Sequence, residues 1–326
     1  MNAKKVIIDC DPGIDDTLAL MLALSSPELD VLGITVVSGN VPVEKGAENA
    51  LKVLDWMNRK DIPVYLGEPL PLVRNYVDAM DTHGDDGLGE SNYPTITDIR
   101  PHTDAVGFLR DTLLHTPHVS VIALGPLTNL ARLYQISPEA FAQIEEMVSM
   151  GGNYKSHGNC SPVAEYNYWC DPDAAHIVYE AFASMEGKLL HMIGLDVTRQ
   201  IVLTPNILQY MRYTNPVMGE RITNITKFYL DFHWKQEGII GCVINDPLAV
   251  AYFIDRNLCQ GFASYTTVET QGISIGQTLV DTYHFWNKPD NSYILTQTDA
   301  YGFMKFFLQR VINAPESEIE RILKTI

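Results

Sequence analysis

The chain has 326 residues, of which 46% are hydrophobic and 19% are charged; this balance excludes a disordered chain and allows a large buried core. Its 40 Asp and Glu residues outnumber 23 Lys and Arg residues, so the formal charge of −17 argues against a nucleic-acid partner and suits a neutral small molecule or a bound cation. Five scattered cysteines without a Cys-x-x-Cys pair favour a reducing compartment over disulfides or a thiolate zinc site.

No segment of the sequence indicates membrane insertion or export. A stretch of about 18 apolar residues, which a transmembrane helix needs, does not occur. The first residues lead directly into a strand-like segment, without an apolar signal region. We therefore expect a cytoplasmic protein without membrane contacts.

The hydrophobic pattern then alternates between strand-like and helix-like segments. Short apolar or β-branched runs predict strands, and apolar residues at helical spacing predict helices. In chain order, the pattern predicts a strand over 6–8, a helix over 15–25, a strand over 31–37, a helix over 43–58, a polar loop over 81–92, a strand over 119–124, a helix over 127–134, a strand over 146–150, a polar loop over 151–170, a helix over 173–182, a strand over 188–193 and a final helix over 300–324. Such alternation implies an α/β fold with an open, mixed but mainly parallel Rossmann-like sheet and helices on both faces.

Two longer segments complete the C-terminal half. Residues 204–255 are expected to be mainly helical, whereas 262–297 has a β-like pattern with hairpins near Gly272 and Asn291. No linker, low-complexity run or internal repeat divides the chain. We therefore expect a single domain over residues 1–326.

Four carboxylates, those of Asp9, Asp11, Asp15 and Asp16, lie within eight residues where the first predicted strand ends and the first helix begins. In an open α/β sheet, ligands bind at the carboxyl ends of the strands, so these side chains lie where a site is expected. An acid that caps the helix, worth roughly 0.3–1 kcal/mol, would explain one Asp but not four. Four carboxylates would repel one another without a cation, and oxygen-only ligands indicate Ca²⁺ or Mg²⁺ rather than zinc.

With these residues, the chain resembles the inosine–uridine-preferring nucleoside hydrolases. The segment 9–16, Asp-Cys-Asp-Pro-Gly-Ile-Asp-Asp, is similar to the signature of that family. Further matching segments follow in the same order along nearly the whole chain. They are Val-Ser-Gly-Asn at 37–40, Ala-Leu-Gly-Pro-Leu-Thr-Asn-Leu at 123–130, Met-Gly-Gly at 150–152, Gly-Asn at 158–159, Ala-Glu-Tyr-Asn at 164–167, Asp-Pro at 171–172 and Asn-Asp-Pro at 245–247. The resemblance implies hydrolysis of the N-glycosidic bond of ribonucleosides to ribose and free base, in purine or pyrimidine salvage.

The resemblance also implies a Ca²⁺ ion at the bottom of the pocket. Asp11, Asp16 and Asp246 would supply carboxylates and Thr128 a backbone carbonyl, which leaves room for water and sugar hydroxyls in a shell of about 6–8 oxygens. Asp246 could instead merely cap the helix that it begins. The ion would lower the pKa of a water, and Asp11 would remove its proton. The carboxylates would stabilise an oxocarbenium-like transition state.

Other matched positions are expected to bind the substrate. Asp15 and Asn40 would lie near the 2′ and 3′ hydroxyls of the ribose, and Asn159 and Glu165 would reach the 5′ hydroxyl. The remaining positions assigned to substrate binding are Met150, Asn167 and Tyr229. Each Asn could instead belong to loop structure, because Asn favours turns.

The sequence departs from the family at Asn245, where many members have a histidine that is proposed to protonate the departing base. An Asn can donate a hydrogen bond but cannot act as a general acid, whose help is typically worth about 10²–10⁴-fold in rate. The candidate replacements are His83, in a loop that matches the pocket edge, and His233, one helical turn after Tyr229. Alternatively, His233 and Trp234 pack on the helix or at a subunit contact, or Trp234 stacks on a purine.

Two other classes of protein remain as alternatives. Haloacid-dehalogenase-like phosphatases also carry an Asp-x-Asp after the first strand, where Asp9 and Asp11 could serve, although the charge of −17 disfavours phosphate capture. A nucleoside-binding protein that lost catalysis through Asn245 is the second alternative. The resemblance further implies a homo-oligomer, either a dimer or a tetramer. The base preference should depend on the loops at 75–92 and 225–242.

Overall fold

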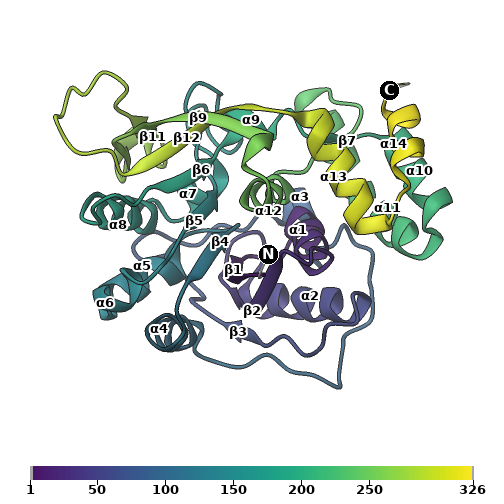
Figure 1. The fold of residues 1–326 in the computed structure, drawn as a ribbon, viewed down its shortest axis with the longest axis horizontal. Coiled ribbons are helices and arrows are strands. Elements are labelled where there is room, and N and C mark those ends of the chain that lie inside the picture. Colours follow the sequence, from purple (N-terminus) through teal and green to yellow (C-terminus); the bar gives the residue numbers. More distant parts are fainter. Residues whose placement is uncertain (1–2, 325–326) are drawn as a thin grey trace.

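The computed structural model describes residues 3–324, which form an eight-stranded sheet with helices on both faces (Figure 1). The strands, in their order across the sheet, are β3 (Val64–Leu66), β2 (Leu29–Val36), β1 (Lys4–Cys10), β4 (Val119–Ala123), β5 (Met147–Met150), β6 (Leu190–Ile193), β12 (Ser292–Thr298) and β9 (Cys259–Ser264). Neighbouring strands are parallel except for β12 and β9, which are antiparallel. The predicted α/β fold with an open, mixed and mainly parallel sheet is confirmed.

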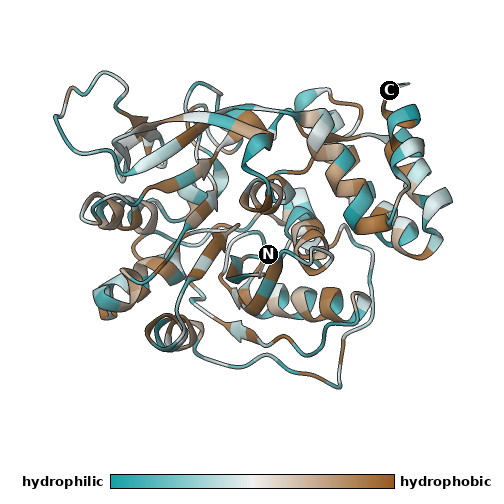
Figure 2. Cartoon of the chain, in the orientation of Figure 1, coloured by the Kyte–Doolittle hydropathy of each residue, from teal (hydrophilic) through white to brown (hydrophobic). Residues whose placement is uncertain are grey.

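Two hydrophobic cores lie on the two faces of this sheet, because successive strand residues point to opposite faces. In β1, Val6 and Ile8 belong to one core and Ile7 to the other. The helices that contribute to the first core include α1 (Ile14–Leu24), α2 (Val43–Trp56), α10 (Pro205–Thr214), α11 (Pro216–Glu237), α12 (Asp246–Ile254), α13 (Ala300–Ile312) and α14 (Glu316–Leu323), and those that contribute to the second include α4 (Ala105–His115), α5 (Thr128–Ile136), α6 (Pro138–Phe141) and α8 (Pro172–Ala183). Figure 2 shows that hydrophobic residues gather on the strands and on the helix sides that cover them.

Several short elements connect these parts. They are α3 (Met80–His83), α7 (Tyr166–Cys170), α9 (Leu195–Thr198), the paired strands β7 (Val202–Leu203) and β8 (Cys242–Val243), the paired strands β10 (Thr266–Val268) and β11 (Thr278–Val280), and the 3-10 turns η1 (Arg256–Leu258) and η2 (Gly272–Ser274). Among residues 3–324, no helix combines the length and the apolar character needed to cross a membrane.

The predicted helices and loops differ from the structure in three details. The predicted loops 81–92 and 151–170 contain the short helices α3 and α7. The helix predicted over 300–324 is divided into α13 and α14. The division occurs at Asn313, which ends α13 in the left-handed conformation (φ 55°), a conformation that Asn tolerates.

One of the two predicted hairpins is present. β10 and β11 pair antiparallel on either side of Gly272, so that prediction is confirmed. The hairpin near Asn291 is wrong, because this residue leads into β12, whose partners are β6 and β9. The amide of Asn291 instead ties the strand to Thr266, accepting from its N–H (2.8 Å) and donating to its carbonyl (2.9 Å).

The outer edge of β3 is closed by a segment that is not a strand. The N–H of His102 donates to the carbonyl of Val64 (2.7 Å), and the N–H of Leu66 donates to the carbonyl of His102 (2.8 Å). Because β2 pairs with the other edge of β3, the backbone of this short strand is bonded on both sides.

A crevice is expected beside β1, since the chain places β2 on one side of it and β4 on the other. The carboxyl ends of the parallel strands lie along one edge of the sheet. Asp11 follows β1, Asn40 follows β2, Leu124 follows β4 and Met150 ends β5. The fold therefore brings the matched segments together at this edge.

Candidate active site

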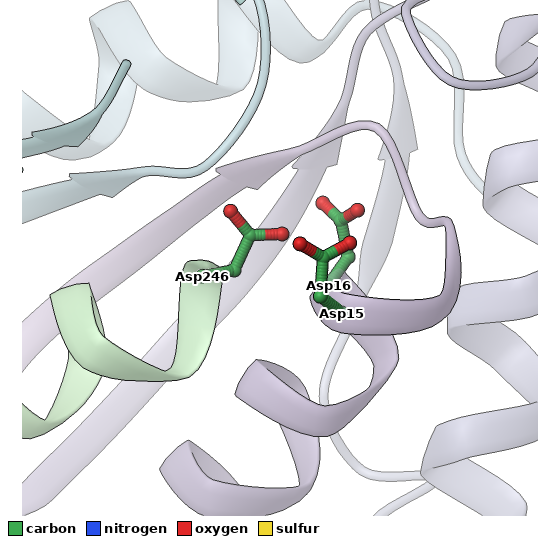
Figure 3. A group of neighbouring side chains, drawn as sticks. All are labelled: Asp15, Asp16 and Asp246. Atoms are coloured by element: carbon green, nitrogen blue, oxygen red, sulfur yellow. The ribbon is translucent and has the colours of Figure 1, made fainter. Parts of the chain in front are cut away.

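Three carboxylates from the first turns of two helices converge at this edge. Asp15 and Asp16 lie in the first turn of α1, and Asp246 is the first residue of α12. Figure 3 shows the side chain of Asp246 pointing toward the other two, and one carboxylate oxygen of each residue lies within 4.8 Å of those of the others. All three side chains are buried. The positive ends of both helix dipoles favour negative charge here.

Burial raises the pKa of Asp16 and of Asp246, because a low-dielectric environment disfavours the charged form of a carboxylate. Burial, and then the charge of Asp15, raises the pKa of Asp16 to about 7 and the pKa of Asp246 well above its usual range. A bound cation would stabilise the charged carboxylates and lower these pKa values again. The oxygen-only donor set therefore fits a hard divalent cation.

Asp11 lies beside this group and has one free oxygen. Its Oδ2 accepts the N–H of Asn40 (2.7 Å), and its own N–H donates to Oδ1 of Asp16 (3.2 Å). Its Oδ1 is buried and has no hydrogen-bond partner among the described residues. Only glycine fits at Gly39 and Gly125, since a Cβ there would lie 2.0 Å from Oδ2 and 2.4 Å from Oδ1, respectively. A buried oxygen without a partner indicates that a cation or a water completes its bonding.

The other predicted metal ligand, Thr128, begins α5, and its hydroxyl donates to Oδ2 of Asp171 (2.7 Å). Asp171 also accepts the N–H of Ala174 (3.0 Å) as the cap of α8. The hydroxyl thus joins two helices. The prediction for Thr128 concerns its backbone carbonyl, and it stays a prediction.

Asp9 is buried within the sheet and has a structural role. Its Oδ1 accepts hydrogen bonds from the hydroxyl of Thr35 (2.5 Å) and from the amide of Asn129 (2.7 Å). Burial raises its pKa to about 7, although both hydrogen bonds act in the opposite direction. Asp9 is therefore poorly placed to act as the nucleophile that the phosphatase alternative requires.

A cavity of about 510 Å³ opens next to the carboxylates, and this volume is typical of small-molecule sites. It brings together most of the residues expected to bind substrate or to act in catalysis. These are Asp15, Asn40, His83, Met150, Asn159, Glu165, Asn167, Tyr229, His233, Asn245 and Asp246. Asp11, Asp16 and Thr128 are not among the residues that line it.

Glu165 forms one wall of the cavity, immediately before α7. Its carboxylate accepts three backbone N–H groups, those of Asn167 (2.8 Å), Gly152 (2.8 Å) and Tyr168 (3.2 Å). Burial nevertheless raises its pKa to about 7. The carboxylate therefore orders the loop and the helix around it, and Glu165 also lines the cavity.

The predicted asparagines also make structural hydrogen bonds. Asn40 donates from Nδ2 to the carboxylate of Asp16 (3.0 Å), and Asn167 donates to the carbonyl of Leu124 (2.7 Å). Oδ1 of Asn159 accepts the N–H of the residue that begins α7 (2.9 Å). The loop role weighed for each Asn is thus present, and all three side chains also border the cavity.

Another part of the cavity lining comes from α3, α11 and the start of α12. Oδ2 of Asp15 accepts hydrogen bonds from Nδ2 of Asn245 (3.0 Å) and from the hydroxyl of Tyr229 (3.4 Å). The ring of Tyr229 lies between those of His83 and His233, with centroids 5.3 Å and 4.4 Å away. Burial lowers the pKa of both histidines. The structure therefore groups these side chains around one carboxylate.

The two histidines differ in the hydrogen bond at Nδ1. Nδ1 of His83 accepts the backbone N–H of Ile14 (3.1 Å), so the proton of the neutral ring is on Nε2. Nδ1 of His233 lies 2.9 Å from the carbonyl oxygen of Tyr229. A carbonyl can only accept, so His233 carries its proton on Nδ1 and has a free lone pair on Nε2.

Several lining residues were not predicted from the sequence. They are His157, Tyr166, Arg199, Phe232, Gln236 and Glu237, among others. Tyr166 lies within a matched segment and could have been noticed there. Trp234, by contrast, is 60% exposed and does not line the cavity, so a base bound in the cavity would not stack on it.

Comparisons with known proteins agree with this arrangement. Residues 6–305 match the family described as inosine-uridine preferring nucleoside hydrolase. The chain is 34% identical over 312 residues to the pyrimidine-specific ribonucleoside hydrolase RihA of Escherichia coli O81 (strain ED1a), covering 95% of this chain and 98% of that protein. It is also similar to the structure of a purine-preferring ribonucleoside hydrolase from Gardnerella vaginalis (TM-score 0.87, 31% identity, 95% and 98% of the two chains). A plant nucleoside hydrolase, the PpNRh1 enzyme, gives the same TM-score of 0.87 and 31% identity over 96% and 99% of the two chains.

The family match and these relatives define the class of protein as a ribonucleoside hydrolase, and the α/β fold with its carboxylate cluster is consistent with that class. The chain belongs to the inosine-uridine preferring nucleoside hydrolase family. The predicted family is confirmed, and the phosphatase alternative is wrong.

Proposed function

We propose that the chain hydrolyses ribonucleosides to ribose and free base with a bound Ca²⁺ ion, and that Asp11 is the general base. The observation that carries the proposal is the cluster of three buried carboxylates, those of Asp15, Asp16 and Asp246. This cluster lies next to Oδ1 of Asp11, which has no hydrogen-bond partner among the described residues, and beside the cavity. Asp11, Asp16, Asp246 and the carbonyl of Thr128 would hold the ion. When bound, Ca²⁺ would neutralise the carboxylates and lower the pKa of water in the site.

Asp11 would take the proton of the attacking water at Oδ1. This oxygen has no other partner among the described residues, and the N–H of Asn40 fixes the other oxygen. The carboxylates around the ribose would stabilise positive charge that develops at C1′ in the transition state. Burial strengthens this effect, because water does not screen the charges.

The cavity residues would bind the ribose through its hydroxyls. Asp15 and Asn40 would contact the 2′ and 3′ hydroxyls, and Asn159 and Glu165 the 5′ hydroxyl, with Met150 and Asn167 beside them. A site that hydrogen-bonds hydroxyls rejects analogues without them. We therefore expect poor turnover of 2′-deoxynucleosides, measured as release of the free base. Equal kcat/KM for uridine and 2′-deoxyuridine would contradict this assignment.

We further propose that His233 protonates the departing base and that His83 holds it by a hydrogen bond. His233 can gain a proton at Nε2 and keep its bond to the carbonyl of Tyr229. His83 would lose its bond to Ile14 if it were protonated at Nδ1, because two N–H groups would then face each other. It is therefore suited to donate from Nε2 as a neutral ring. Asn245 would keep Asp15 in place and take no part in proton transfer.

Neither base class is favoured by the comparisons, because the named relatives are pyrimidine-specific in one case and purine-preferring in another. We propose ribonucleosides as the substrate class, in nucleobase salvage.

We also propose a single domain over residues 1–326, supported by one sheet that contains both β1 and β12. A cytoplasmic location is supported by five free cysteines. Assembly into dimers or tetramers can be measured by light scattering.

The first experiment would follow ribose release as reducing sugar from a panel of purine and pyrimidine ribonucleosides, with and without a Ca²⁺ chelator. The proposal predicts release that the chelator stops and added Ca²⁺ restores. Calorimetric titration with Ca²⁺ would test the metal site independently of activity. Release that the chelator leaves unchanged would contradict the role of the metal. Nucleoside binding without any ribose release would support the nucleoside-binding alternative instead.

A further inference from the structure

A short helix beside the cavity, α9, anchors the loop that carries Asn159. The carboxylate of Asp196 in α9 accepts three consecutive backbone N–H groups of this loop, those of Tyr154 (2.6 Å), Lys155 (2.8 Å) and Ser156 (3.0 Å). These bonds fix the first half of the loop. The second half depends on the residue that follows α9.

That residue is Arg199, whose side chain is 17% exposed. Its Nη1 donates to Oγ of Ser156 (2.5 Å) and to the carbonyl of His157 (2.7 Å), and its Nη2 donates to the carbonyl of Gly158 (3.0 Å). Charge-assisted hydrogen bonds of this kind are stronger than neutral ones. The guanidinium thus holds the three residues that immediately precede Asn159.

The turn beyond these residues is rigid in itself. A Cβ at Gly158 would lie 2.1 Å from the carbonyl oxygen of Ser161, so only glycine fits there. The N–H of Asn159 donates to the carbonyl of Ala164 (3.1 Å). Because a rigid turn moves as a unit, the position of Asn159 depends on the contacts that hold the turn, among them those of Arg199.

Arg199 also contacts α11. Its Nη2 lies 3.6 Å from Oε1 of Glu237, the last residue of α11, and both side chains line the cavity. Since α11 carries Tyr229 and His233, one guanidinium connects the loop that we propose to bind the ribose with the helix that we propose to contact the base. The bidentate and planar form of Arg allows this, whereas a Lys would offer a single point of attachment.

We propose that Arg199 is a positioning residue that sets recognition of the 5′ hydroxyl by holding the loop of Asn159 against α11. This inference rests on the proposed function, because it uses the assignment of Asn159 to the 5′ hydroxyl. Arg199 itself does not touch the reacting atoms. Its loss should affect substrates that carry a 5′ hydroxyl more than substrates that lack one.

The test compares Arg199→Met, Arg199→Lys and the wild type on a ribonucleoside and its 5′-deoxy analogue. We expect Arg199→Met to lower kcat/KM for the ribonucleoside by about tenfold or more, mainly through KM, and for the analogue by less than about twofold. Arg199→Lys should restore part of the difference. Arg212→Met, which removes an exposed ion pair to Glu220 (2.8 Å), is the matched control and should leave both substrates unaffected. Equal losses on both substrates, or none, would overturn the proposal.

The ion pair between Arg199 and Glu237 is tested separately. Glu237→Gln removes the ion pair and keeps the three bonds to the loop, so we expect a smaller loss than in Arg199→Met. The double variant should be no worse than Arg199→Met alone, because the two side chains act through one contact. Additive losses would overturn the connection between the loop and α11.

Hydrogen exchange gives a readout that does not depend on activity. Backbone amides of residues 157–159 should exchange faster in Arg199→Met than in the wild type, whereas those of residues 154–156, which Asp196 holds, should change less. The thermal midpoint should stay close to that of the wild type. Unchanged exchange would overturn the proposed anchoring. If the wild type released no ribose from any nucleoside, the proposed function would fail, and the exchange experiment would still decide whether Arg199 anchors the loop.

Discussion

At the scale of single residues, the free Oδ1 of Asp11 is the atom most directly tied to the proposed chemistry. We expect Asp11→Asn to lower kcat by about 10²–10⁴-fold, because an amide cannot take a proton from water. The measurement is steady-state kinetics on ribonucleosides. Asp30→Asn, an exposed position in β2, is the control and should retain full activity. A kcat for Asp11→Asn close to that of the wild type would exclude this residue as the general base.

The two histidines give a prediction for the dependence on pH. Burial lowers the pKa of His233 below its usual 6.5, and a general acid acts only in its protonated form. The kcat/KM of the wild type should therefore decline as pH rises through a pKa below 6.5. In His233→Gln this decline of kcat/KM with rising pH should disappear, together with most of the activity. His83→Gln should retain the decline and raise KM, since Gln can still donate a hydrogen bond. The opposite pattern would assign the acid to His83.

How far sequence could predict the site also depends on single residues. Most residues expected from the matched segments, such as Asp15, Asn40 and Glu165, do border the cavity. Arg199 could not be found this way, because it binds backbone carbonyls 41 and 42 residues away. Backbone carbonyls occur at every residue and leave no trace in the sequence.

At the scale of elements, the strand-to-helix turns must leave space for Asp11. Gly125 follows β4, and a Cβ there would lie 2.4 Å from Oδ1 of Asp11. We expect Gly125→Ala to displace this carboxylate and to lower both Ca²⁺ affinity and kcat, by about tenfold or more. Calorimetric titration with Ca²⁺ and kinetics would measure the two effects. Gly187→Asn is the control, because that position has open space and a φ of 74° that Asn accepts. Normal Ca²⁺ binding by Gly125→Ala would contradict the requirement.

The main strands were predictable because their apolar runs are buried on both faces. Among the elements that were missed, β3 and α4 were missed for different reasons. β3 has three residues (Val64–Leu66), too few for a pattern. α4 had a usable signal, since Asp104 caps it by accepting the N–H of Gly107 (2.8 Å), and an apolar helical pattern follows. The sequence alone also did not indicate that Asn291 ends a loop by bonding to β10.

At the scale of the whole molecule, the ion should contribute to stability. Segments far apart in the chain supply Asp11, Asp16 and Asp246, so binding is possible only in the folded state. Free Ca²⁺ at about 100 times its Kd should stabilise the fold by about 2.7 kcal/mol. We expect a rise of several degrees in Tm on adding Ca²⁺ to chelator-treated protein, measured by calorimetry. Asp246→Asn should largely remove the rise, and an unchanged wild-type Tm would argue against the metal site.

The closed edge of β3 limits how copies of this chain can associate. Open strand edges allow molecules to extend one another's sheets and aggregate. At this end, the hydrogen bonds of His102 to Val64 and Leu66 already occupy the groups that a partner strand would need. If copies of this chain associate on this side, their contacts would therefore form through side chains of helices and loops, which can be altered by surface substitutions without disturbing the sheet that carries the site.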